Sequence, residues 1–165
     1  MSRSKYFGKF LILIIVLMTV GCDQVSKEIT RQKVDPKAFI PILKNHLILT
    51  NVENTGAILG FGQDFPPILK RFLLQLLPKL LLLILLYRIM GKPNLNLLVI
   101  IAFALVIGGG LGNLIDRIAY GSVTDFFQIR LGFFRTGIFN MADVAVTLGL
   151  FMFIFLIVRG KKIAI

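Results

Sequence analysis

The chain has 165 residues, of which 56% are hydrophobic, and its mean hydropathy of +0.85 excludes an ordinary soluble domain and indicates a small polytopic membrane protein. Its formal net charge is +11, but the basic residues flank the apolar runs, which favours a place beside a bilayer over a nucleic-acid-binding face. A single cysteine, Cys22, excludes an intrachain disulfide framework, and with one histidine, His46, we expect no metal and no cofactor.

The first apolar run, residues 10–22, follows a short basic N-terminus and suits either a signal-peptide core or a membrane span. Its end, TVGC at residues 19–22, resembles the cleavage box of a bacterial lipoprotein, so one alternative is a lipoprotein whose mature chain begins at Cys22. Asp23 and Lys27 follow at a spacing of four, the order that favours an ion pair on one helix face. We therefore interpret residues 6–26 as a retained span.

Residues 28–64 are mixed and mostly polar, and prolines interrupt any helix. The runs HLILT at residues 46–50 and AILGF at residues 57–61 have a β-like composition, which predicts a small extramembrane sheet or hairpin platform. His46 is expected on the surface of a strand. Asn54 and Gly56 are expected in a turn between the two runs.

The second and third spans are predicted over residues 68–88 and 95–115. The second contains Pro78, which predicts a kink, and Lys79, whose place near the middle of a span has no evident reason. In the third, Gly108 and Gly112 have the small-xxx-small spacing that lets another helix approach closely. The residues after them, Asn113, Asp116 and Arg117, should share one face at the end of this helix, with Asp116 linked to Arg117.

Residues 120–137 are predicted to form a loop that contains Asp125, and residues 138–158 form the fourth predicted span. Asp143 would lie four to five residues inside that span, on a polar stripe with Asn140 and Thr147. If both acids share one pocket of low dielectric, they hold a single proton between them, as in aspartic peptidases. The same pair could equally serve as a proton relay or an ion site.

The predicted fold is therefore an all-α membrane protein with four transmembrane helices and a small extracytoplasmic β platform, forming one domain over residues 1–165. Four spans place both termini on one side. The N-terminus, the turn at residues 88–94 and the C-terminus are basic and contain no acid, which favours the cytoplasm for both ends and the opposite face for the acids.

Five motifs resemble those of one known family. They are DQVSK at residues 23–27, NTGAILG at 54–60, GGGLGNLIDR at 108–117, GSVTDFF at 121–127 and FNMADVAVTLG at 139–149. In this order, and with four spans, the chain resembles the bacterial lipoprotein signal peptidases, or type II signal peptidases. The resemblance implies an intramembrane aspartic endopeptidase that cuts the signal peptide from prolipoproteins just before a diacylglyceryl-modified cysteine.

The resemblance also implies the site residues. The family's catalytic aspartates fall on Asp125 and Asp143. Its other functional positions, which bind substrate or support the site, fall on Asp23, Lys27, Asn54, Gly56, Gly108, Asn113, Asp116, Arg117, Asn140 and Ala142.

The implied setting is the bacterial cytoplasmic (inner) membrane, with the acids at the periplasmic face. The expected partners are lipidated prolipoproteins and membrane lipids, without nucleic acid, and the protein is expected to be a monomer. Two other classes compete: a proton-coupled transporter, which needs acids accessible from both sides, and a lipoprotein anchored at Cys22, which would lose its first 21 residues.

Overall fold

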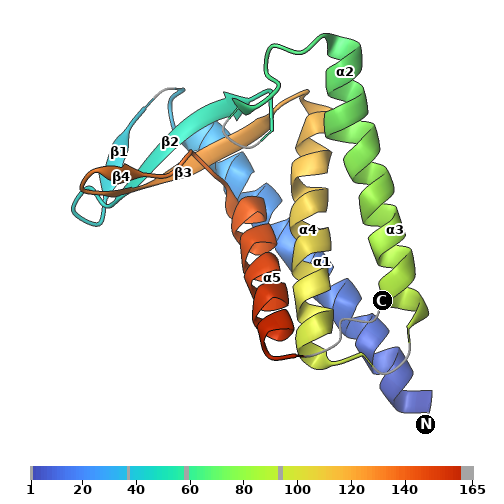
Figure 1. Cartoon of the computed structure of the whole chain (residues 1–165). Helices are drawn as coiled ribbons and strands as arrows, with labels where there is room; N and C mark the ends of the chain where they lie inside the picture. Colours follow the sequence, from blue (N-terminus) through green and yellow to red (C-terminus); the bar gives the residue numbers. More distant parts are fainter. Residues whose placement is uncertain (1, 37, 58–59, 93–94, 161–165) are drawn as a thin grey trace.

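The computed structural model of the protein describes residues 2–36, 38–57, 60–92 and 95–160 (Figure 1). Four helical rods stand side by side with a small sheet at one end. The rods are α1 (Ser2–Lys33), a second rod of three pieces, α4 (Leu97–Ala119) and α5 (Met141–Val158). All four contain a segment long and apolar enough to cross a membrane, so the predicted fold class is confirmed.

Several predicted boundaries shift. α1 continues past residue 26 to Lys33, so the start of the expected platform belongs to the helix. α4 extends to Ala119, and α5 begins at Met141, three residues later than the predicted span. The polar ends of α1 and α4 stay helical because their charged side chains pair with one another across the helices, as described below.

The second rod consists of α2 (Pro67–Arg71), a π-helical turn η2 (Phe72–Leu76) and α3 (Leu77–Gly91). Pro78 has no backbone N–H to give to the preceding turn, and the wider π-helical turn lies directly before it. Lys79 is exposed on the outside of the rod, away from the bundle interior.

Glycines set the distances between α4 and its neighbours. A Cβ on Gly108 would lie 2.7 Å from Thr19 Cβ of α1, and one on Gly112 would lie 2.6 Å from Asp23 Oδ2. Gly109 faces the backbone of α5 in the same way, at Ala142 O. The close approach predicted from the small-residue spacing is confirmed, since α4 touches helices on two sides through positions without a side chain.

The half of the bundle away from the sheet has an apolar core. Phe103 packs edge-on against Phe153, with ring centroids 4.5 Å apart. The buried members of this core come from all four rods, and they are Ile12, Val16, Ile89, Val99, Ile100, Phe103, Ala104, Ile107 and Leu156.

The sheet has four antiparallel strands in the order β1 (Ile40–Ile42), β2 (Leu47–Asn54), β3 (Val123–Leu131) and β4 (Phe134–Arg135). The predicted loop at residues 120–137 is therefore wrong, because it contains β3 and β4.

The predicted strand at residues 57–61 is also wrong in its described part, where Ala57, Gly60 and Phe61 form turns; residues 58 and 59 lie outside the described residues. Gly60 has φ +76°, which interrupts an extended run, and β2 pairs with β3 instead.

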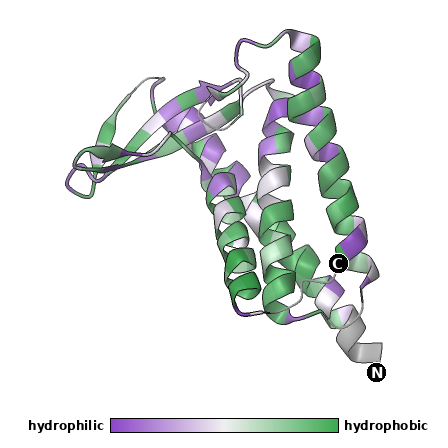
Figure 2. Cartoon of the chain, viewed as in Figure 1, coloured by the Kyte–Doolittle hydropathy of each residue, from purple (hydrophilic) through white to green (hydrophobic). Residues whose placement is uncertain are grey.

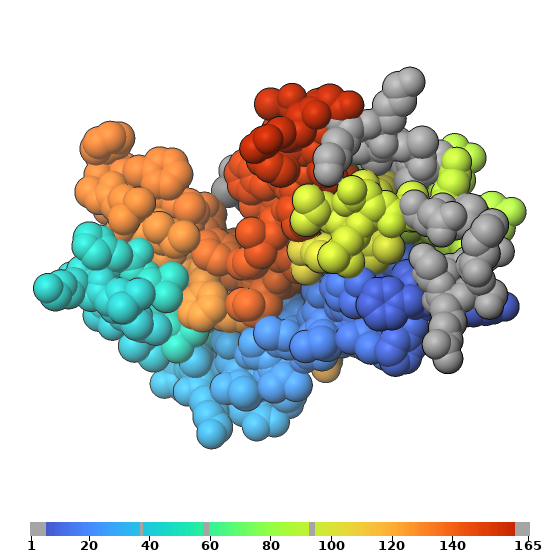
Figure 3. Space-filling model, turned by 90° about the horizontal axis from the view of Figure 1, so that it is seen from below, coloured from blue at the N-terminus to red at the C-terminus, as the bar shows by residue number. Residues whose placement is uncertain are grey.

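The sheet projects sideways beyond the helices, both in Figure 1 and in the view from below in Figure 3. Figure 2 shows that hydrophilic residues gather in the sheet and in the helix ends near it, while the rest of the bundle is mostly hydrophobic. The sheet end of the bundle is therefore where polar chemistry is concentrated.

Candidate active site

The start of α5 forms a capping box. Asn140 is the N-cap, and its Oδ1 accepts a hydrogen bond from the backbone N–H of Asp143 at 3.0 Å. In return, Asp143 Oδ2 accepts from the backbone N–H of Asn140 at 3.2 Å. Asp143 is thus the third residue of α5 and lies closer to the start of the helix than the sequence predicted, because α5 begins at Met141.

Asn140 also reaches the second acid. Its Nδ2 donates to Asp125 Oδ1 at 2.6 Å, and Asn54 Nδ2 donates to Asp125 Oδ2 at 3.0 Å. Asp125 belongs to β3 and is only 4% exposed. Pairing with Val52 of β2 holds this carboxylate in place more firmly than the predicted loop would.

Asn113 of α4 completes the group. Its Nδ2 donates to Asp143 Oδ1 at 2.8 Å, and its Oδ1 lies 3.1 Å from Asn140 Nδ2. All four carboxylate oxygens of Asp125 and Asp143 therefore accept an N–H, and Asn140 is hydrogen-bonded to both acids. The structure thus brings three predicted residues, Asn54, Asn113 and Asn140, into hydrogen bonds with these two carboxylates. A fourth, Gly56, donates its N–H to Asn54 Oδ1 and so helps to orient that amide.

Burial raises the pKa of Asp125 to about 6. The hydrogen bond from Asn54 opposes this change, and the nearby charge of Asp143 adds to it. The hydrogen bond from Asn140 and the charge of Lys27 lower the pKa by smaller amounts. Asp125 therefore holds a proton more readily than an exposed aspartate does.

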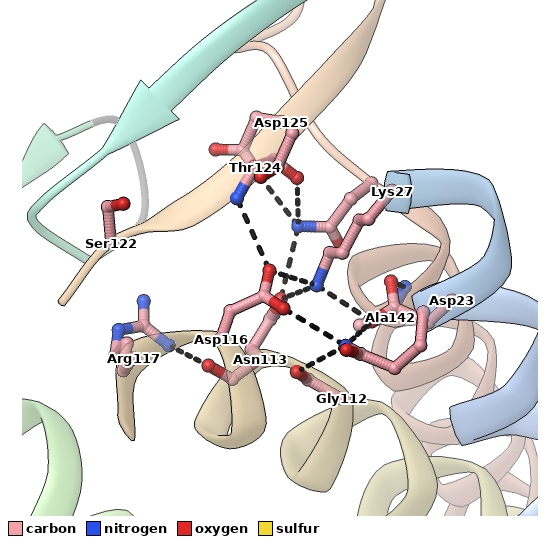
Figure 4. A network of polar contacts seen from close by, with 12 residues as sticks. Asp23, Lys27, Gly112, Asn113, Asp116, Arg117, Ser122, Thr124, Asp125 and Ala142 are labelled. Carbon is pink, nitrogen blue, oxygen red and sulfur yellow. Dashed lines mark hydrogen bonds and ion pairs between the residues drawn. The ribbon is translucent and has the colours of Figure 1, made fainter. Parts of the chain in front are cut away.

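Behind these residues lies a buried ion cluster, which we define as Asp23, Lys27, Arg31 and Asp116. Figure 4 shows Asp23, Lys27 and Asp116 of this cluster. Lys27 Nζ lies 2.7 Å from Asp23 and 3.0 Å from Asp116, and all three side chains are 0% exposed. Arg31 Nη2 lies 3.2 Å from Asp116. The predicted pair of Asp23 and Lys27 is confirmed.

The predicted link between Asp116 and Arg117 is wrong. Adjacent residues on a helix point about 100° apart, so the two side chains leave α4 in different directions. Arg117 instead donates to Gly56 O at 3.0 Å and to Asn113 O at 3.5 Å. It therefore ties the turn after β2 to the end of α4.

Other predicted residues have packing roles here. Ala142 is fully buried, and its N–H donates to Asp23 Oδ1 at 2.8 Å. A Cβ on Gly56 would lie 2.6 Å from Gly60 O, so only glycine fits that turn. Gly108 packs on α1 and is hydrogen-bonded to neither acid, and Thr147 is exposed.

Sequence reasoning missed Arg31, Gln24 and Thr124. Arg31 Nε donates to Thr124 Oγ1 at 2.8 Å, and its guanidinium stacks 4.2 Å from the ring centroid of Tyr120. Gln24 Nε2 donates to Asp116 Oδ1 at 3.0 Å. The signal for Arg31 was present, because it extends the four-residue spacing of Asp23 and Lys27 by one more turn.

Comparison with known proteins identifies the family of the chain. A family model described as signal peptidase (SPase) II matches residues 15–159. The chain belongs to the signal peptidase II family. It is therefore a peptidase, as the sequence motifs implied.

Similar proteins span nearly the whole chain. A lipoprotein signal peptidase of Halothermothrix orenii is 33% identical over 156 residues, which cover 93% of this chain and 99% of that protein. A lipoprotein signal peptidase of Chlorobium phaeobacteroides is 37% identical over 153 residues, with 88% and 85% covered. A solved bacterial membrane enzyme aligns with a TM-score of 0.81 at 26% identity, covering 94% of this chain and 93% of its own. The chain thus has the fold of a multi-pass membrane enzyme.

Proposed function

We propose that this protein is an intramembrane aspartic peptidase that cuts prolipoproteins just before a diacylglyceryl-modified cysteine, with Asp125 and Asp143 activating the attacking water. Membership of the signal peptidase II family supports removal of signal peptides from prolipoproteins as the overall reaction. The observation that carries the mechanism is the shared hydrogen bonding of both acids to Asn140 at one end of the bundle.

The two acids have different surroundings, which suggests different roles. Both acids accept two N–H donors, but only Asp143 lies in the first turn of a helix, where the dipole of α5 favours a negative charge. Asp125 is buried on a strand and has a raised pKa. We assign Asp143 as the ionised base and Asp125 as the protonated acid.

In the proposed reaction, Asp143 takes a proton from the water as its oxygen attacks the scissile carbonyl carbon. Asp125 gives its proton to the carbonyl oxygen, so a neutral tetrahedral gem-diol forms. When the C–N bond breaks, Asp143 returns a proton to the leaving nitrogen, and Asp125 takes back the proton from the hydroxyl that becomes the new carbonyl. The dyad then holds one proton, as at the start.

The shape of the molecule supports a substrate that arrives from the side. The sheet projects past α5, and in the view from below the outline is hollowed between the end of the sheet and α5 (Figure 3). The acids lie where β3 meets the start of α5. A lipid-anchored peptide moving within the bilayer can reach that place without leaving the membrane.

The proposed orientation puts both termini in the cytoplasm of a bacterial inner membrane and the sheet in the periplasm. A membrane-impermeant thiol reagent, applied to intact spheroplasts in a Cys22→Ala background, should label Asp35→Cys and leave Lys92→Cys unlabelled. The reverse labelling would contradict this orientation.

The enzymatic test uses purified protein and a diacylglyceryl-modified peptide containing the cleavage box. The parent should cleave this peptide and spare the unlipidated one. Asp125→Asn and Asp143→Asn should each lower kcat by about 1000-fold or more, and the double variant should be little worse, because the acids act as one unit.

Asp35→Asn is the matched control, since it makes the same chemical change at an exposed acid. It should cleave within about twofold of the parent, as surface changes usually do. Cleavage near the parental rate by folded Asp125→Asn or Asp143→Asn would overturn the mechanism and favour a proton pathway for these acids.

A further inference from the structure

Lys27 is buried beside the proposed dyad and yet has no direct hydrogen bond to either acid of it. An ammonium group has three N–H donors and no acceptor. Its Nζ has three polar neighbours: Asp23 Oδ2 at 2.7 Å, Asp116 Oδ2 at 3.0 Å and Asn113 Oδ1 at 3.0 Å. Two of these contacts are ion pairs, but the third is to a neutral amide that faces the dyad (Figure 4).

Lys27 is one of two donors, with Asn140, that set which way the amide of Asn113 points. Because Lys27 only donates, Asn113 must present its Oδ1 to Lys27. The Nδ2 of the same amide then faces Asp143, to which it donates at 2.8 Å. The same Asn113 Oδ1 also accepts from Asn140 Nδ2 at 3.1 Å, and this Nδ2 in turn donates to Asp125. The hydrogen bond from Asn140 to Asp125 therefore depends on the orientation of the Asn113 amide.

If the amide of Asn113 were reversed, its oxygen would face Asp143 and its NH₂ would face two other donors, Lys27 and Asn140. Asp143 could then be satisfied at Oδ1 only by carrying a proton itself. The direction of one buried amide therefore selects the protonation state in which Asp143 can act as a base.

We propose that Lys27 is a positioning residue of the peptidase: its hydrogen bond to Asn113 fixes the amide so that an N–H always faces Asp143 and keeps this carboxylate free to accept the proton of the water. The proposal rests on the proposed function of the dyad and goes beyond it by giving the buried ion cluster a role in the reaction. Lys27 is not a catalytic residue, because it acts through Asn113.

Several charged residues surround Lys27 and Asn113, and each can influence the pH dependence of the reaction. α1 contributes Asp23, Lys27 and Arg31, α4 contributes Asp116 and Arg117, and β3 and α5 contribute the two acids of the dyad. Glu53 of β2 accepts from Ser122 Oγ and from Thr124 Oγ1, the same hydroxyl that accepts from Arg31 Nε. A variant that removes only the charge of Lys27 would leave an excess of buried carboxylates, so charge-balanced variants are needed.

The cluster offers two matched double variants. Lys27→Met with Asp23→Asn removes both ion pairs of Lys27 and also the donor to Asn113, while Arg31 remains opposite Asp116. Arg31→Met with Glu28→Gln removes the ion pairs of Arg31 but leaves all three contacts of Lys27 in place. Both double variants change the net charge by zero, so both should fold.

The measurement is the pH dependence of kcat/KM on the lipidated peptide. In Lys27→Met with Asp23→Asn, the acid limb should move to higher pH by about half a unit to one unit, which corresponds to the loss of one hydrogen bond to the ionised base. The acid limb of Arg31→Met with Glu28→Gln should stay at the parental position. KM should change little in both.

A third variant separates the hydrogen bond from the charge. Lys27→Gln with Asp23→Asn restores an N–H donor without a charge, so it should move the acid limb back toward the parental position. If Lys27→Met with Asp23→Asn does not fold, the glutamine variant tests the proposal by itself. An acid limb displaced from the parental position in Lys27→Gln with Asp23→Asn would contradict the proposal.

Equal acid limbs in the parent and in Lys27→Met with Asp23→Asn would overturn the role of Lys27 while leaving the dyad intact. Active Asp125→Asn or Asp143→Asn would instead overturn the proposed function. The two failures are therefore distinguishable in the same assay.

Discussion

The two ends of the helix bundle share helices, but one end buries apolar side chains and the other buries charged and polar ones. At the end away from the sheet, α1, α3, α4 and α5 bury an apolar core around Phe103 and Ile107. At the sheet end, α1 and α4 bury three of the four charges of the ion cluster completely. No residue of the described apolar core is charged, and the buried polar side chains lie at the sheet end.

This difference separates stability from chemistry. Burying charges costs desolvation free energy that their mutual attraction repays only when geometry and hydrogen bonding are good. The apolar half has no such cost and supplies packing. We infer that the apolar half holds the helices in place while the polar half keeps an arrangement that stability alone would not select.

The largest effect on stability should come from Ile107→Ala, because Ile107 is 1% exposed in the apolar core. We expect the free energy of unfolding to fall by about 2–5 kcal/mol, while the pH profile of the folded enzyme stays unchanged. Denaturation in detergent, followed by activity assays below the transition, measures both. Leu150→Ala, at a site 51% exposed on α5, is the control and should cost little. A changed pH profile in Ile107→Ala would contradict the separation.

Gly109→Ala should affect both halves at once, since Gly109 faces Ala142 O and Val146 of α5. The added methyl would push α4 from α5 just below the acids, so we expect about 1–3 kcal/mol of destabilisation and a loss of activity. Gly110→Ala on the same helix meets only the end of the Leu82 side chain, which can move. Thermal unfolding and cleavage rates should therefore separate these neighbouring variants; equal effects would mean that contact with α5 is not the cause.

The smallest effect concerns the pH dependence. Asp125 has a pKa raised from 3.8 to about 6, so it stabilises the fold fully below pH 3.8 and loses this contribution as the pH rises through about 6. As the proposed acid, it should also cause kcat/KM to fall as the pH rises through about 6.

Asn54→Leu removes the hydrogen bond that lowers this pKa, so the basic limb of the profile should move to higher pH. Thr55→Val lies in the same turn, is exposed and should leave the basic limb in place. A basic limb that stays fixed in Asn54→Leu would remove Asp125 from the role of acid.

Sequence reasoning reached the helices because their signal is local. Four long apolar runs predict four spans whatever their neighbours are, and the spacing of Asp23 and Lys27 predicts their pair. The strand β3 was missed because the residues of β2 that pair with it lie 69 to 82 positions earlier, from Asn54↔Val123 to Leu47↔Ile129, and such pairing leaves no local pattern in the sequence. The partner of Asp116 was missed for the same reason, since Lys27 and Arg31 come from another helix. The turn expected at Asn54 and Gly56 is present. It was predictable because its hydrogen bond joins residues only two positions apart.

Asn140 is the N-cap of α5 and is hydrogen-bonded to both acids, which makes the geometry of the site a property of one helix end. Unwinding a single turn there would dismantle the site, and Gly109 against Ala142 O keeps α5 from sliding along α4. For protein engineering, this divides the molecule into parts that can be exchanged and parts that cannot. The far edge of the sheet, at the β3–β4 turn, should accept insertions and grafted loops, whereas the first turn of α5 should tolerate almost no redesign.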